Sequence, residues 1–139
     1  MNVQIIQRQI TADELIDLRQ AVGWGYPDER EAITLGLRNS LFSVCAVNGE
    51  EVIGCGRVIG DGGIAVYIQD IIIKPEYQRC GYGMGIMNAI MTYIETNYVK
   101  GTMVCLMAAK GKENFYRKFG FIERPNETFG AGMIQYLNK

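Results

Sequence analysis

The N-terminal part of the chain shows one alternating apolar pattern, followed by two patterns with helical spacing. Val3 and Ile5 alternate with polar residues, which predicts a short first strand. Thr11, with Glu14 three positions later, predicts a capping box at the start of the first helix, and Asp28 is placed to cap the second. We expect the two helices to bury the apolar residues that recur along them: Leu15, Ile16, Leu18, Val22, Ala32, Ile33, Leu35 and Leu37.

The middle of the chain predicts a hairpin and a central strand. Residues 41–47 and 51–59 favour strands, and they are joined at Asn48-Gly49, a dipeptide suited to a two-residue turn. Residues 61–63, Asp-Gly-Gly, predict a second turn of that kind. Residues 64–74 are nearly all apolar, as expected for the central strand of a sheet that is covered on both faces.

A long helix is predicted after the central strand. Pro75 ends the strand, and an amphipathic helix runs from the glycine-containing turn at 81–85 to about Tyr98. Residues 102–107 then predict another buried strand. The order of these elements is typical of a chain that mixes helices with one sheet.

The C-terminal segment predicts one more helix and two strands. Residues 112–119 predict a short basic helix that stops at Gly120, and a last strand pair is expected around 121–123 and 128–137. The full order is then βααβββαβαββ. We interpret residues 1–139 as a single domain of the α/β (α+β) class.

Length and composition fit one compact domain and exclude several kinds of site. The chain has 139 residues, of which 48% are apolar and 21% charged, enough for a sizeable core. Fourteen basic against fifteen acidic residues leave a net charge of −1, so we expect no nucleic-acid partner. The absence of histidine excludes Ser-His-Asp and Cys-His sites and histidine-ligated metals, and no metal site is expected.

The cysteines and the apolar runs bear on the compartment. Cys45, Cys55, Cys80 and Cys105 are never closer than ten residues, so no CxxC pair suggests a zinc or redox site, and we expect buried, reduced thiols. The first residues lack the pattern of a secretory signal, and no apolar run approaches the ~18 to 20 residues that span a bilayer. We therefore expect a cytoplasmic protein without a membrane partner.

The segment from Asp70 to Met84 carries the most chemical information. An apolar strand leads into a glycine-containing turn that opens a helix, so backbone N–H groups converge at the positive end of a helix dipole. Gly81 and Gly83 let phosphate oxygens approach the backbone, and Arg79 adds a permanent positive charge. The pattern predicts a diphosphate site. The alternative is a tight strand-to-helix turn that binds nothing.

Charge and motif context narrow the kind of ligand. Residues 1–69 hold nine acidic and five basic residues, and residues 70–139 hold six acidic and nine basic ones, so a polyanion would favour the second half. The dinucleotide-binding pattern needs a third glycine where this chain has Ile86, and a P-loop needs Lys-Ser or Lys-Thr where Ile and Met follow Gly85. Both common nucleotide motifs are therefore excluded.

Two motifs together resemble a known family. The run Gln78-Arg79-Cys80-Gly81-Tyr82-Gly83 resembles the Q/R-x-x-G-x-G/A signature of the GNAT superfamily of acetyl-CoA-dependent N-acetyltransferases. The late segment Phe115-Tyr116-Arg117-Lys118-Phe119-Gly120-Phe121 is similar to the Phe-Tyr-x-x-x-Gly-Phe segment of the same family. The resemblance covers nearly the whole chain and implies a single-domain fold with a mixed, mostly antiparallel central sheet flanked by helices.

The resemblance also implies how acetyl-CoA would be bound and CoA released as product. The backbone of Ile71 and Ile73 would pair with the pantetheine arm, much as a peptide adds to a strand edge. The alternative for these residues is a plain core strand, and the two are compatible. The diphosphate loop would comprise Gln78, at its entrance, and the residues after it: Arg79, Cys80, Gly81, Tyr82, Gly83 and Met84.

Two residues are candidates for proton transfer. Tyr116 stands where the family often uses a tyrosine to protonate the leaving thiolate; a phenol with a pKa near 10 suits that role. The alternative is a ring packed beside Phe115 and Phe119. Asp70, in an apolar strand, is a candidate base for the incoming amine. The alternative is an aspartate held by the backbone or by Arg57 in a structural ion pair.

The acceptor is expected to be a small-molecule primary amine, attacked directly in a ternary complex. Tyr67 stands where some family members keep a glutamate base, and it is grouped here with Tyr26 and Glu29 as acceptor-binding. Trp24 is expected to cover the core instead of binding an amine by a cation–π contact. The alternative functions are a non-catalytic acyl-CoA-binding or sensing module and a protein or peptide acetyltransferase. Many relatives are dimers, so a homodimer is possible.

Overall fold

A computed structural model describes residues 2–25 and 29–138 of the chain. Contacts divide the chain into two compact units, one ending at Cys105 and one beginning at Leu106.

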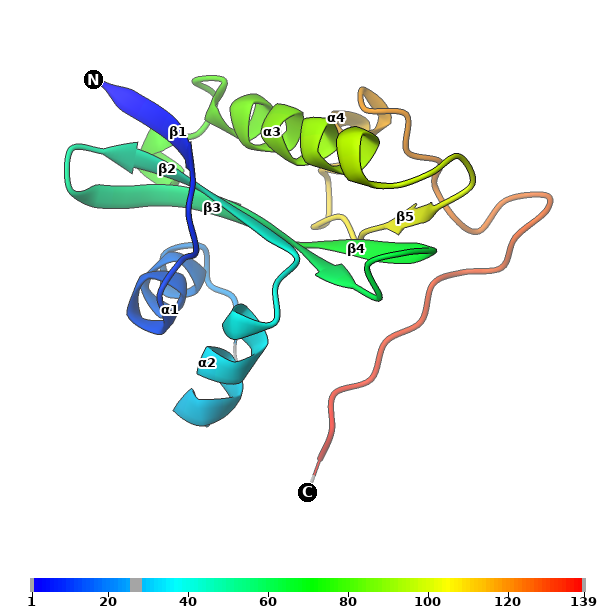
Figure 1. The fold of residues 1–139 in the computed structure, drawn as a ribbon, viewed down its shortest axis with the longest axis horizontal. Coiled ribbons are helices and arrows are strands. Elements are labelled where there is room, and N and C mark those ends of the chain that lie inside the picture. The colour runs from blue at the N-terminus through cyan, green and yellow to red at the C-terminus, as the bar shows by residue number, and fades with distance from the viewer. Residues whose placement is uncertain (1, 26–28, 139) are drawn as a thin grey trace. The chain divides into compact units, whose positions relative to one another are not determined.

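The first unit is built on one five-stranded sheet (Figure 1). Its strands lie side by side in chain order, β1-β2-β3-β4-β5. The first three pairings are antiparallel, and β4 pairs with β5 in parallel, so the sheet is mixed and mostly antiparallel, as predicted. The strands are β1 (Val3–Gln7), β2 (Phe42–Asn48), β3 (Glu51–Gly60), β4 (Ala65–Ile73) and β5 (Met103–Cys105).

Helices cover both faces of this sheet. Figure 1 shows α3 (Tyr82–Asn97) on one face and α1 (Ala12–Ala21) and α2 (Arg30–Arg38) on the other. Because β3 and β4 are covered on both sides, their side chains contribute to two cores. The fully buried side chains of α3 are Ile86, Met87 and Ile90, and the core against α1 and α2 includes Leu18, Cys45, Cys55 and Ile72.

The predicted capping box at the start of α1 is confirmed. Thr11 Oγ1 accepts from the Glu14 backbone N–H at 3.2 Å, and Glu14 Oε1 accepts from the Thr11 N–H at 2.9 Å. Arg8 donates to both oxygens of Glu14, at 2.8 and 2.7 Å. These bonds stabilise the charged carboxylate and lower the pKa of Glu14 to about 2, the bond from Arg8 being the largest cause.

The second helix differs in detail from the sequence prediction. Its N-cap is Glu29, which makes no side-chain capping bond, and Asp28 lies outside the described residues. Ile33 and Leu37 are buried as expected, whereas Ala32 and Leu35 are exposed. Two buried residues four positions apart, Ile33 and Leu37, are enough for this short helix to pack on the sheet.

The hairpin and the fifth strand also differ slightly. Asn48 pairs with Glu51, so the two-residue turn consists of Gly49 and Glu50 instead of Asn48-Gly49. Gly49 has a φ of +63°, which explains the glycine there. The strand predicted at 102–107 is shorter, and Met103 is 54% exposed, because β5 lies at the edge of the sheet.

The second unit contains one short helix and an irregular segment. α4 (Glu113–Arg117) ends close to Gly120, whose φ of +87° accounts for the predicted stop. The strand pair expected within 121–138 is wrong, since these described residues form no strand. Pro125 lacks an N–H, and Asn126 Oδ1 accepts from the Thr128 and Phe129 N–H groups, so local turns replace a ladder here.

The mixed helix and sheet architecture of the α/β (α+β) class is confirmed. Among the described residues, none of the helices has both the length and the apolar character needed to cross a membrane.

Candidate functional site

A β-bulge in β4 marks the centre of the candidate site. Cys55 pairs with Ile72 and Arg57 with Gln69, so Asp70 and Ile71 together face the single residue between them on β3. Asp70 has a φ of +56°, a conformation that aspartate tolerates better than most residues. The residue opposite is Gly56, where a Cβ would lie 2.7 Å from side-chain atoms of Ile71 and Ile86. The bulge therefore depends on a glycine opposite it.

Beyond the bulge, one edge of β4 is open. Pairing with β5 ends at Tyr67 and Cys105, so within the described part of the first unit no strand pairs with that edge from Ile68 onward. The Lys74 N–H donates to Ile53 O on β3 at 2.8 Å. Because backbone groups alternate along a strand, the N–H groups of Ile71 and Ile73 point to the open edge.

The predicted loop residues lie next to this edge. Gln78 Nε2 donates to Ile73 O at 2.9 Å, so its side chain ties the start of the loop to the end of β4. Arg79 and Gly81 both have positive φ, +63° and +88°. The turn that precedes α3 thus reverses sharply over three residues.

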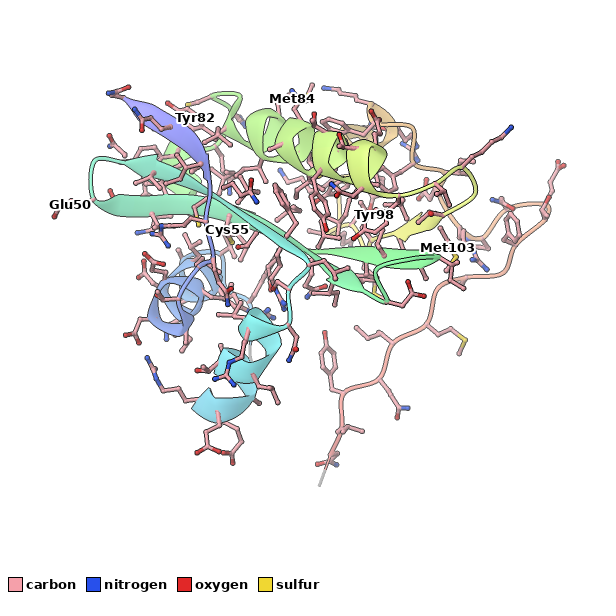
Figure 2. The ribbon with its side chains drawn as sticks, in the orientation of Figure 1. Glu50, Cys55, Tyr82, Met84, Tyr98 and Met103 are labelled. Atoms are coloured by element: carbon pink, nitrogen blue, oxygen red, sulfur yellow. The ribbon has the colours of Figure 1, made fainter. Side chains whose placement is uncertain are left out.

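The N-terminus of α3 presents free backbone donors in the geometry of an anion site. Gly81 is the N-cap, and no side chain in the described ranges caps this helix. The first intrahelical bond runs from the Gly85 N–H to Gly81 O at 3.1 Å, so the N–H groups of Tyr82, Gly83 and Met84 precede it. Figure 2 shows Tyr82 and Met84 at this end of α3. A Cβ on Gly81 would contact nothing within 4 Å, which leaves its backbone accessible.

These residues fit the diphosphate and pantetheine parts of a coenzyme. An uncapped helix N-terminus beside an arginine suits a diphosphate, and an open strand edge suits a chain of amides. Cys80 lies in the same loop and is exposed, with its Sγ 3.4 Å from Gln78 O. The expectation of four buried thiols is therefore wrong for Cys80, because the glycine beside it in the loop has no side chain that could cover the thiol. It is only partly right for Cys105, which is half-buried.

Asp70 is engaged in a buried ion-pair cluster. Arg19 Nη1 donates to its Oδ1 at 2.6 Å, and Arg57 Nε donates to its Oδ2 at 2.9 Å. The Asp70 side chain is only 1% exposed. The interpretation of Asp70 as an ion-pair partner of Arg57 is confirmed, and both carboxylate oxygens are already used by guanidinium groups.

Arg19 is the site residue that sequence reasoning missed. It lies one turn after Leu15 on α1 and so shares the face that packs on the sheet. A charged residue at that spacing within an apolar stripe was the available signal. It indicates a buried partner, which Asp70 supplies from 51 residues away.

A cavity adjoins the two arginines. Its volume is about 110 Å³, and it lies between α1 and α2, over β3. We call it the arginine cavity, and its lining residues are Leu15, Ile16, Arg19, Ala32, Ile33, Gly36, Leu37 and Arg57.

Tyr116 belongs to the second unit and is buried there. Its ring makes edge-to-face contacts with Phe115 and Phe121, at centroid distances of 5.0 and 6.3 Å. Burial raises the pKa of Tyr116 to about 12, so the hydroxyl keeps its proton at neutral pH. The predicted packing of the ring is confirmed with Phe115, and this packing is compatible with a role in proton transfer.

The predicted acceptor residues have different surroundings. Tyr67 is half-buried in β4, between Ile59 and Cys105, whereas Glu29 is exposed at the start of α2. Tyr26 lies outside the described residues. Trp24 is 37% exposed, so the expectation that it covers the core is wrong; it lies after the end of α1 at Ala21, outside the helix face that packs on the sheet.

Comparison with known proteins identifies the family. Residues 38–123, more than half of the chain, match the model of the acetyltransferase (GNAT) domain. The uncharacterized N-acetyltransferase ycf52 of Porphyra purpurea is 28% identical over 132 residues, which cover 93% of this chain and 74% of that protein. The chloroplastic GCN5-related N-acetyltransferase 1 of Arabidopsis thaliana is also 28% identical, over 91% of this chain and 64% of that one.

Solved structures agree with that match. A Staphylococcus aureus protein named a probable acetyltransferase superimposes with a TM-score of 0.85 and is 38% identical, covering 97% of this chain and 100% of its own. A GNAT family acetyltransferase of Streptococcus pneumoniae gives a TM-score of 0.78 at 29% identity, covering 99% of both chains. The resemblance carried by the two motifs is confirmed, and the chain belongs to the GNAT family of N-acetyltransferases.

Proposed function

We propose that this protein transfers the acetyl group of acetyl-CoA to the amine of a small molecule. The observation that carries the proposal is the juxtaposition of an uncapped α3 N-terminus with the open edge of β4. One provides donors for a diphosphate, and the other provides donors for the amides of pantetheine.

Each part of the loop has a separate task in binding. The N–H groups of Tyr82, Gly83 and Met84 donate to diphosphate oxygens, and Arg79 adds charge. Gln78 holds Ile73 O, so Ile73 contributes its N–H to the coenzyme, as does Ile71. Cys80 contributes through its place in the loop, not through its thiol.

Tyr116 is proposed as the general acid. Bound acetyl-CoA would supply the acetyl group and leave as CoA, whose thiolate needs a proton. With its pKa raised to about 12, the Tyr116 hydroxyl is fully protonated at pH 7 and holds a proton to donate. At neutral pH almost none of the Tyr116 side chain is phenolate, which could not donate a proton to the thiolate.

Asp70 is proposed as a positioning residue and not as the base. Both its oxygens accept hydrogen bonds from Arg19 and Arg57, so neither is presented to an incoming ammonium group. Its side chain fixes two guanidinium groups, and its backbone forms the bulge that aims Ile71.

The proposed acceptor is small because the arginine cavity is small and lies between packed helices. Tyr67, on β4 just before the strand opens, and Glu29, at the start of α2, remain proposed acceptor contacts. A single functional domain over residues 1–139, a cytoplasmic location and a homodimer also remain predictions.

The proposal is tested by turnover. Purified protein is incubated with acetyl-CoA and a panel of primary amines; release of free CoA and formation of the acetylated amine are measured by thiol titration and mass spectrometry. We expect equal amounts of both products with at least one amine. Binding of acetyl-CoA without turnover of any amine would instead support a sensing module.

A further inference from the structure

The arginine cavity has an unusual charge. Its two charged lining residues are Arg19 and Arg57, and none of the lining residues, all in the described part of the chain, is acidic. The carboxylate of Asp70 lies behind the arginines, with 1% of its side chain exposed. Among the residues that the structure describes, one carboxylate against two guanidinium groups leaves one positive charge in excess at the cavity wall.

The excess positive charge is partly buried, and a bound anion would neutralise it. The side chains of Arg19 and Arg57 are only 20% and 14% exposed, so water screens them less than surface charges. A partly buried positive charge is stabilised by an oxyanion that accepts its remaining hydrogen bonds. The apolar side chains that line the cavity limit the hydration of the guanidinium groups and so strengthen a hydrogen bond between a guanidinium group and an oxyanion.

Both guanidinium groups are held in position before any ligand arrives. Arg19 Nε donates to Gly25 O at 2.8 Å while its Nη1 binds Asp70. Arg57 donates through Nη1 to Gly36 O and to Ser40 Oγ, at 3.3 and 3.2 Å. Fixed donors lose little conformational freedom on binding, which is the condition for selective recognition.

The volume suits a small charged group. A cavity of about 110 Å³ is comparable to the ~150 Å³ that holds a benzene molecule in an engineered protein core. A carboxylate or phosphate group with a short stem fits such a space. A long peptide does not.

We propose that the arginine cavity binds an oxyanion of the acceptor, so that the acceptor is a small amine that also carries a carboxylate or a phosphate. This inference rests on the proposed acetyl transfer and names the class of its substrate. Asp70 connects the two regions: its side chain holds the arginines, and the next residue, Ile71, lies at the open edge of β4. The oxyanion would occupy the cavity while the amine reaches that edge.

The first test compares matched acceptors. L-Threonine is paired with L-threoninamide, and phosphoethanolamine with ethanolamine, so each pair differs in one oxyanion. We expect kcat/KM for the anionic member of a pair to be about 10- to 100-fold higher, as charge-assisted hydrogen bonds allow. The pair that shows the preference distinguishes a carboxylate from a phosphate. Equal or better use of the neutral members would overturn the inference.

Two variants locate the preference in the cavity. Arg57→Gln should remove it mainly by raising KM for the anionic member, whereas Arg38→Gln, on the exposed end of α2, should leave it unchanged. Gly36→Leu keeps both arginines and Asp70 and fills the cavity, because a Cβ there contacts nothing within 4 Å. It should raise KM for the acceptor without changing acetyl-CoA affinity. An unchanged KM in a folded Gly36→Leu protein would contradict the proposal.

A binding measurement decides the inference without any turnover. The Nε–H resonances of Arg19 and Arg57 are followed by NMR during titration with acetate and with inorganic phosphate, and Arg38 serves as the exposed reference. We expect saturable shifts at Arg19 and Arg57 and only a weak, linear shift at Arg38. Identical behaviour of all three arginines would refute an anion site, even if acetyl-CoA binds. A saturable shift with no acetyl transfer would place the failure in the proposed function instead.

Discussion

Asp70 is a single carboxylate that neutralises one of two partly buried guanidinium groups. Arg19 and Arg57 lie at 2.6 and 2.9 Å from its oxygens. Replacing a buried member of an ion pair by a neutral group leaves its partner desolvated and uncompensated, which costs more than the pair contributes. The residue therefore matters to stability first and to the site through the arginines that it orients.

Asp70→Asn should lower the free energy of unfolding by about 2 to 4 kcal/mol. The measurement is chemical denaturation at pH 7. Asp17→Asn is the matched control, since Asp17 pairs with Lys74 at 3.0 Å but is 64% exposed, and Lys74 keeps Glu51. That change should cost less than about 1 kcal/mol. Equal effects of the two substitutions would contradict the structural role of Asp70.

Tyr116→Phe should lower kcat by about 100-fold or more while the affinity for acetyl-CoA stays the same. The change removes one hydroxyl and keeps the ring that packs against Phe115 and Phe121. Because burial raises the pKa of Tyr116 to about 12, the phenol remains in its acid form well above neutral pH. Steady-state kinetics and calorimetry measure the two quantities. An unchanged kcat would remove Tyr116 from the mechanism.

At the scale of elements, α1 and α3 start in opposite ways. Thr11, Glu14 and Arg8 close the N-terminus of α1 with side chains, so its donors are satisfied within the chain. Gly81 leaves the N-terminus of α3 without a side-chain cap among the described residues. Side chains close one helix start, whereas the other leaves backbone N–H groups available for the proposed anion.

Glu14→Gln should lower the free energy of unfolding by about 1 kcal/mol at pH 7, because the ion pair with Arg8 is lost. The pKa of Glu14 is about 2 in the folded protein, below its ordinary value of 4.5. Its contribution is therefore fully present above pH 4.5 and lost as the pH falls toward 2. Denaturation at several pH values should show wild type and variant converging in acid; a constant difference would contradict the assignment.

Local patterns predicted the elements that local interactions determine. The capping box at Thr11, the stop at Gly120 and the helix from 82 to 97 each depend on residues within a few positions of one another. The strand pair within 121–138 was wrong because strand formation depends on a partner, which alternating apolar residues do not specify. Leu35 is exposed because it lies two positions from both buried residues of α2, Ile33 and Leu37, and therefore on the opposite face of the helix.

The candidate site divides in the same way. The loop from Gln78 to Met84 is contiguous, so its sequence alone indicated an anion site, and the open edge at Ile71 and Ile73 followed from the family resemblance. The cluster of Arg19, Arg57 and Asp70 joins α1, β3 and β4, and no local pattern specifies that meeting. Its parts were visible in the sequence, but the net positive charge of the cavity became evident only in three dimensions.

At the scale of the whole molecule, exposed apolar side chains are concentrated in the C-terminal segment. Those with at least 80% exposure there are Ile122, Met133, Tyr136 and Leu137. Such side chains favour association with another surface. We predict a dimer mass by light scattering at micromolar concentration. A monomer mass over the whole concentration range would contradict this prediction.

We expect the α3 N-terminus and the open edge of β4 to bind acetyl-CoA, and calorimetric titration measures this binding. Acetyl-CoA, free CoA and NAD are titrated into the wild-type protein and into Gly83→Leu, whose side chain would obstruct the approach of phosphate to the backbone. We expect saturable binding of acetyl-CoA and CoA, no binding of NAD, and clearly weaker binding by the variant. Absence of acetyl-CoA binding to the folded wild-type protein, or equal affinity in the variant, would contradict this expectation.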